Sequence, residues 1–120
     1  MYTEIKTFED ACQVQNLDPL TVIPDFSLFP RKDREAMIAH AKLIIIANAI
    51  NGDWVPDWSD WSQNKYSPWF NMDDGFSSDG YADWSAGSSV SSRLCFESRE
   101  KAEYVGRQFQ ELYKIYFIKS

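Results

Sequence analysis

SREKAEYVGRQFQELYKIY, residues 98–116, has the pattern of an amphipathic helix from one end to the other. Ser98 is a preferred N-cap residue, because its hydroxyl can accept a hydrogen bond from an amide of the first turn. Apolar side chains follow at helical spacing and define one stripe, which consists of Ala102, Val105, Gly106, Phe109, Leu112, Tyr113 and Tyr116. Charged and amide side chains take the opposite side. We therefore predict a helix whose stripe lies across a sheet or against another helix.

Two more helices are predicted nearer the N-terminus. Thr7 is a candidate cap for a short helix that runs to about Asn16, with acidic residues in its first turn. A longer helix is expected to begin at Pro30 and to end at Gly52. Its second half, residues 43–47, is apolar nearly all round, which is typical of a buried helix rather than a solvent-facing one.

After this helix the composition changes to Trp, Tyr, Phe, Asp, Ser and Gly, which favours short strands and turns. We expect strands at 65–71 and 75–84, joined by a hairpin turn at 73–75. A third strand is expected at 92–96, after a small polar loop at 85–92. The predicted fold is α+β: a small three-stranded antiparallel sheet with two or three helices packed on one face.

The length of 120 residues suits one domain, residues 1–120. The net charge of −6 disfavours binding to duplex nucleic acid. The first residues lack the pattern of a signal peptide, and no apolar run is long enough to cross a membrane. We expect a cytoplasmic protein that does not bind membranes, with Cys12 and Cys95 as buried thiols in a reducing compartment.

No recognisable pattern of catalytic residues is present. His40 is the single histidine, and no Ser-His or Cys-His arrangement accompanies it. The aspartates between 73 and 83 do not have the spacing of a calcium loop, and the glycines do not form a phosphate-binding loop. We therefore expect no enzymatic activity, no metal site and no cofactor.

Asp-Trp dipeptides occur four times, and three of them fall within nine residues. In one interpretation the indole rings cover the small sheet and the aspartates cap turns. In the other, Trp58, Trp61 and Trp69 belong to a binding surface, because an indole offers a large flat apolar face beside a carboxylate that accepts hydrogen bonds. The dipeptides are Asp53-Trp54, Asp57-Trp58, Asp60-Trp61 and Asp83-Trp84.

Three strings, 54–58 (WVPDW), 65–70 (KYSPWF) and 92–104 (SRLCFESREKAEY), resemble a family of small proteins carried by prophages and mobile elements of anaerobic, gut-type bacteria. The likeness covers about the last two-thirds of the chain and, more loosely, residues 7–12. No activity is established for that family, so the resemblance implies a genomic setting and assigns no role to any residue.

These observations favour a non-enzymatic interaction protein of a phage or mobile element. Its partner would be a protein, for example a host defence factor with a basic nucleic-acid-binding surface, which the acidic charge would attract. The expected contacts are Asp57, Trp58, Asp60, Trp61 and Trp69. The alternative is a ligand-binding module whose aromatic segment stacks on a carbohydrate or on single-stranded nucleic acid.

Overall fold

The computed structural model describes residues 1–73, 75–85 and 92–118, except for the side chains of Trp84 and Ser92. The order of elements along the chain is η1 (Tyr2–Glu4), α1 (Phe8–Val14), η2 (Arg31–Asp33), α2 (Arg34–Asn51), β1 (Lys65–Asn71), β2 (Ser77–Trp84), η3 (Ser92–Leu94), α3 (Arg99–Gln108) and α4 (Gln110–Phe117), where η marks a 3-10 helix. The α+β prediction is correct, but the predicted strand and helix arrangement needs correction.

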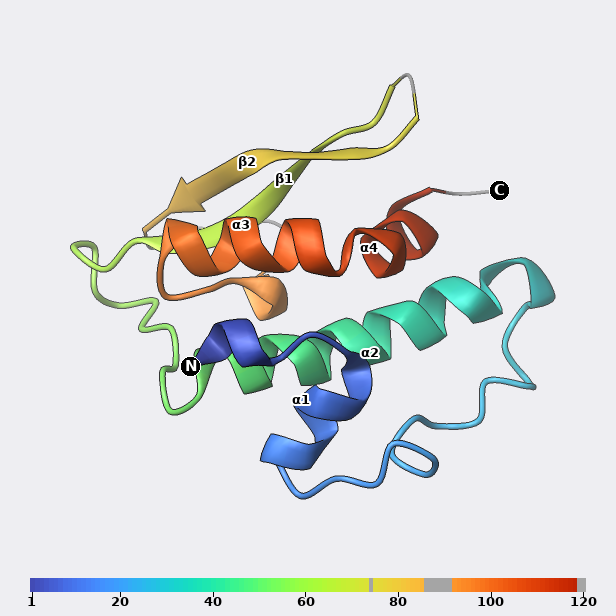
Figure 1. Ribbon diagram of the computed structural model, residues 1–120. Helices are drawn as coiled ribbons and strands as arrows, with labels where there is room; N and C mark the ends of the chain where they lie inside the picture. The colour runs from blue at the N-terminus through green and yellow to red at the C-terminus, as the bar shows by residue number, and fades with distance from the viewer. Residues whose placement is uncertain (74, 86–91, 119–120) are drawn as a thin grey trace.

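Helices form the middle of the molecule. Figure 1 shows α3 and α4 nearly end to end, with the β1–β2 hairpin crossing α3 on one side and α2 on the other side. The short helix α1 packs against α2 in turn. The predicted central helix is therefore real, but it packs between helices and not on the sheet. In the described part of the chain the hairpin is covered mainly by α3, together with aromatic side chains of α4.

The predicted three-stranded sheet is wrong, because the sheet in the described residues consists of β1 and β2 alone. The expected third strand at 92–96 begins instead as η3, and only Phe96 pairs with β1. Phe96 exchanges two backbone hydrogen bonds with Tyr66, at 3.0 and 2.6 Å. The next residue of β1 that would bond on this edge is Pro68, which has no N–H to donate. The pairing therefore cannot extend in that direction.

Local capping signals place the starts of α1 and α3 and the end of α2 where the sequence predicts them, but α2 begins at Arg34, after η2, and not at Pro30 as expected. The Thr7 hydroxyl accepts a hydrogen bond from the Asp10 amide at 3.0 Å, while the Asp10 carboxylate accepts one from the Thr7 amide at 3.1 Å. Ser98 caps α3 by accepting from the Lys101 amide at 3.2 Å. Gly52 ends α2 with a φ of 60°, a left-handed conformation that glycine adopts without strain.

The last helix is divided at Phe109, whose φ of −114° and ψ of 27° separate α3 from α4. Both pieces keep the apolar stripe inward, and directly after the break Gln110 binds the backbone at the start of β2 and of the residue before it. Its amide nitrogen donates to the Phe76 carbonyl at 2.9 Å, and its amide oxygen accepts from the Ser78 N–H at 3.0 Å. Gln110, expected on the polar side, therefore fixes the hairpin to the helix pair.

At Gly106, α3 crosses close to the hairpin. A Cβ atom added there would lie 2.9 Å from the Pro68 Cβ and 3.2 Å from the Ser78 Oγ. The same crossing is filled beside it by Phe70, which stacks on Phe76 at 4.6 Å between ring centroids and contacts Tyr113 at 4.8 Å. The aromatic residues of the hairpin thus complete the core that the helices begin.

The hairpin turn predicted at 73–75 includes residue 74, and the loop predicted at 85–92 includes residues 86–91; these positions lie outside the described residues. β1 has the bounds that were predicted for it, and β2 begins two residues later than expected.

Candidate functional site

The segment between α2 and β1 contains the tripeptide Asp-Trp-Ser twice in succession, at 57–59 and 60–62; we call residues 57–62 the Asp-Trp-Ser loop. Both copies form the same turn. The Asp57 carboxylate accepts from the backbone N–H and the hydroxyl of Ser59, at 3.0 and 2.6 Å. The Asp60 carboxylate does the same for Ser62, at 2.9 and 2.6 Å. The expectation that these aspartates cap turns is confirmed.

A buried lysine anchors this loop. The Lys65 side chain has no exposed surface, and its ammonium group donates to the backbone carbonyls of Asp57 at 2.5 Å, Asp60 at 3.3 Å and Ser85 at 2.6 Å. It also lies 5.1 Å from the centroid of a Trp58 ring. One cation therefore joins both turns of the loop to β1 and to the residue that follows β2. Three carbonyls and an indole ring take the place of the water that would hydrate the ammonium group in solution.

The two carboxylates of the loop keep their negative charge into acidic solution. Hydrogen bonds from Ser59, first from its hydroxyl and then from its backbone, lower the pKa of Asp57 below its ordinary value. Ser62 lowers the pKa of Asp60 in the same way. Lys65 contributes a smaller lowering to both pKa values through its positive charge. The loop is thus a fixed anionic segment at neutral pH.

The tryptophans expected to form one surface have different environments. Trp58 is half-buried beside Lys65, whereas the Trp61 side chain is 75% exposed. Trp69 is 57% exposed and lies on β1, four residues beyond Lys65, which corresponds to about 13 Å along a strand. The structure brings Asp57, Trp58 and Asp60 together around Lys65, and it leaves Trp61 and Trp69 exposed at separate positions.

Trp58 also lines a groove with a volume of about 490 Å³. Trp54 and Trp58 supply its two indole rings, and Ile44 and Val55 supply aliphatic surface. Two polar side chains reach it from distant parts of the chain: Asn48 from α2 and Arg93 from η3. Both are exposed, and in the described part of the chain neither has a hydrogen bond or an ion pair.

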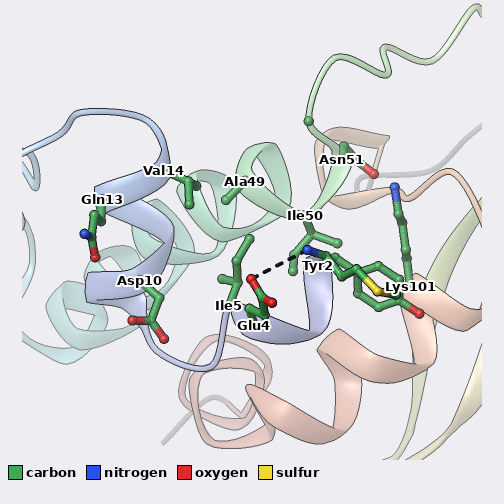
Figure 2. A pocket seen from close by; sticks show the side chains of 12 residues that line it. Tyr2, Glu4, Ile5, Asp10, Gln13, Val14, Ala49, Ile50, Asn51 and Lys101 are labelled. Atoms are coloured by element: carbon green, nitrogen blue, oxygen red, sulfur yellow. Dashed lines mark ion pairs between the residues drawn. The ribbon is translucent and has the colours of Figure 1, made fainter.

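A second hollow, of about 510 Å³, lies between the N-terminal segment and the end of α2 (Figure 2). Its charged groups already have partners within the chain. The Met1 amino group is 3.6 Å from the Glu4 carboxylate, the Asp10 carboxylate caps α1, and the Lys101 ammonium is 2.7 Å from Glu97. All three contacts are local, and they leave the hollow with few free polar groups to offer a ligand.

A third groove, of about 710 Å³, lies between α4 and the start of α2. Phe29, Ile115 and Phe117 line it with partly exposed apolar surface, and charges of both signs surround them, including Lys32 and Glu111. Nothing in the described residues indicates what would cover this face.

His40 lies on α2 with its ring 4.5 Å from the Tyr116 ring. Its Nδ1 is buried without a hydrogen-bond partner among the described residues, and desolvation lowers the pKa of His40.

Cys12 and Cys95 are buried free thiols, as expected, and desolvation raises the pKa of Cys95 to about 11. In the described residues no three metal-ligating side chains gather, and no helix there is long and apolar enough to span a membrane.

Sequence patterns did not identify Lys65 or Arg93. Lys65 is the first residue of β1 and Arg93 was expected in the third strand, so neither carried a local signal for its position. What distinguishes them is contact with segments far away in the chain. No family model, curated protein or solved structure matches this chain.

Proposed function

We propose that the protein is a non-enzymatic interaction protein that binds another protein through its Asp-Trp-Ser loop and Trp69. The supporting observation is that Trp61, 75% exposed, projects from a loop whose backbone is held by Lys65. Tryptophan is enriched among the residues that dominate binding energy at protein interfaces. Because the loop is already ordered, less conformational entropy is lost when a partner covers it.

The charge of the loop favours a basic partner. Asp57 and Asp60 flank the indoles, and their lowered pKa values keep both carboxylates ionised. An acidic rim around an aromatic anchor increases the association rate with a positively charged surface. A protein with a basic nucleic-acid-binding surface, such as a defence factor of the host of a phage or mobile element, has the required chemistry. The proposed compartment is the cytoplasm.

In this proposal Trp58 has a different role from the one expected. Its ring is half-buried beside the Lys65 ammonium, so it supports the loop more than it contacts the partner. Trp61 and the two carboxylates are the primary contacts, and Trp69 extends the surface along β1.

The test is a quantitative affinity capture from a lysate of a gut anaerobe, followed by binding measurements with the purified partner. Trp61→Ala should abolish capture of a protein that the wild type retains. Leu28→Ala is the matched control, because Leu28 is 99% exposed and lies outside the loop, and it should capture as the wild type does. Thermal unfolding should be unchanged in both variants.

Salt and charge provide the second arm of this test. Replacing Asp57 and Asp60 by Lys should slow association with the purified partner, and high salt should weaken wild-type binding. The proposal is wrong if no captured protein depends on Trp61, or if charge reversal leaves the association rate unchanged.

A further inference from the structure

We propose that the groove between Trp54, Trp58 and Arg93 binds a small ligand that joins a flat aromatic ring to an anionic group, of the chemical class of a nucleoside monophosphate. The proposal does not depend on the protein-binding function, because Trp61 and Trp69 do not line this groove. It assigns a role to Arg93 and Trp54, which the loop surface does not use.

The size and lining of the groove fit a ligand of this kind. Its volume of about 490 Å³ lies within the range of small-molecule sites. Trp54 and Trp58 are both half-buried, so each ring is supported by the fold and still presents surface to the groove. Stacking on such rings suits any ligand with a flat π face.

Arg93 determines the charge of the ligand. Among the described residues that line the groove it is the one charged side chain, and no carboxylate of the described chain pairs with it. In a protein with a net charge of −6, an arginine without a counter-ion is a local point of attraction for an anion. The planar guanidinium binds phosphate or carboxylate oxygens in a bidentate manner.

The small number of free polar groups favours an aromatic ring over a sugar as the stacked part. Asn51 donates to the Cys95 carbonyl at 2.9 Å and accepts from the Glu97 amide at 3.3 Å, so its carboxamide is already used. Asn48 remains as the free carboxamide of the described lining. One carboxamide can bind the edge of a base, but it leaves the several hydroxyl groups of a sugar ring without partners.

The acidic charge of the protein also favours binding of a free small ligand over binding of a nucleic-acid strand. A strand would place its flanking phosphates against a protein of charge −6, including Asp57 and Asp53 beside the groove, whereas a single nucleotide needs only Arg93. The proposed ligand is therefore the free small molecule.

Isothermal titration calorimetry with AMP, GMP, CMP and UMP tests the proposal directly. At least one should bind with a Kd of about 0.1 mM or tighter. Adenosine or the matching nucleoside, which lacks the anion, and ribose 5-phosphate, which lacks the ring, should each bind at least about tenfold more weakly. A single-stranded decamer should not bind more tightly than the mononucleotide.

Two arginine variants control for general charge effects. Arg93→Gln should weaken nucleotide binding by about tenfold or more. Arg107→Gln removes an arginine of α3 that is also exposed but lies outside the groove, and it should leave the affinity unchanged. The proposal is overturned if none of the four nucleotides binds at millimolar concentration, if Arg93→Gln binds as the wild type does, or if ribose 5-phosphate, the nucleoside or the decamer binds as tightly as the nucleotide.

Discussion

Replacing Lys65 by Met removes the ammonium group that holds the Asp-Trp-Ser loop and keeps an unbranched apolar side chain of similar length. In the wild type the ammonium donates three hydrogen bonds to the carbonyls of Asp57, Asp60 and Ser85. None of these carbonyls has another side-chain donor among the hydrogen bonds of the described residues. The variant therefore isolates the contribution of one buried cation to the order of the loop.

The expected cost follows from two opposing terms. Hydrogen bonds to a charged group are worth about 1.5–3 kcal/mol each, so three of them contribute roughly 4.5 kcal/mol at the lower end. Removing the charge also removes the penalty for burying it, which amounts to several kcal/mol in protein interiors. Since the loop carbonyls lie near solvent, water replaces part of what is lost. We expect a net loss of about 2–4 kcal/mol in the free energy of unfolding and a melting temperature lower by about 10 °C.

Urea unfolding and amide hydrogen exchange measure the two consequences separately. Exchange of the Ser59 and Ser62 amides, which donate to the aspartates, should accelerate in Lys65→Met more than exchange in α2 does. Lys32→Met, which removes an exposed lysine of η2, is the control and should change stability by less than about 0.5 kcal/mol. A loss below about 0.5 kcal/mol in Lys65→Met, with loop exchange unchanged, would refute the idea that Lys65 organises the loop.

Gly106→Ala should destabilise the protein by about 1–2 kcal/mol in urea unfolding, because the new Cβ would lie 2.9 Å from Pro68 and the crowding exceeds the gain in helix propensity. A more stable variant would show that α3 and the hairpin do not cross so closely. For His40→Gln we expect a flatter dependence of melting temperature on pH as the pH falls below the ordinary pKa of histidine. Burial lowers the pKa of His40 in the folded protein from its ordinary 6.5. The neutral ring therefore contributes its full stabilisation above pH 6.5, and this contribution is lost as the pH falls through the folded pKa. Parallel curves of melting temperature against pH for the two proteins would contradict this role.

Helix ends were predictable because their signals are local. The Thr7 and Ser98 hydroxyls each bind an amide three residues away, and Gly52 adopts a backbone conformation that glycine allows. The bounds of β1 were also predictable from composition. All of these features depend on a few neighbouring residues, so the amino-acid sequence alone contains the information.

The prediction of a third strand was wrong because the conformation of residues 92–96 depends on contacts between distant segments. Residues 92–96 have the composition of a strand, but Pro68 removes the donor that a longer ladder would need. Asn51, at the end of α2, instead binds the backbone of Cys95 and Glu97 and holds this segment against the helix. No local pattern shows that the Asn51 carboxamide, some forty positions earlier, will bind this backbone in place of a neighbouring strand.

The Asp-Trp-Ser loop shows the same limit at the candidate site. Both copies of the tripeptide form the same turn, as their identical local sequence predicts, yet Trp58 is half-buried and Trp61 is 75% exposed. The difference arises from Lys65, which lies near the Trp58 ring and is fixed in part by the Ser85 carbonyl beyond β2. One buried cation thus gives two equal sequence units unequal roles. It makes the first indole part of the support and leaves the second free to contact a partner, which is why Trp61, and not the pair, carries the proposed interface.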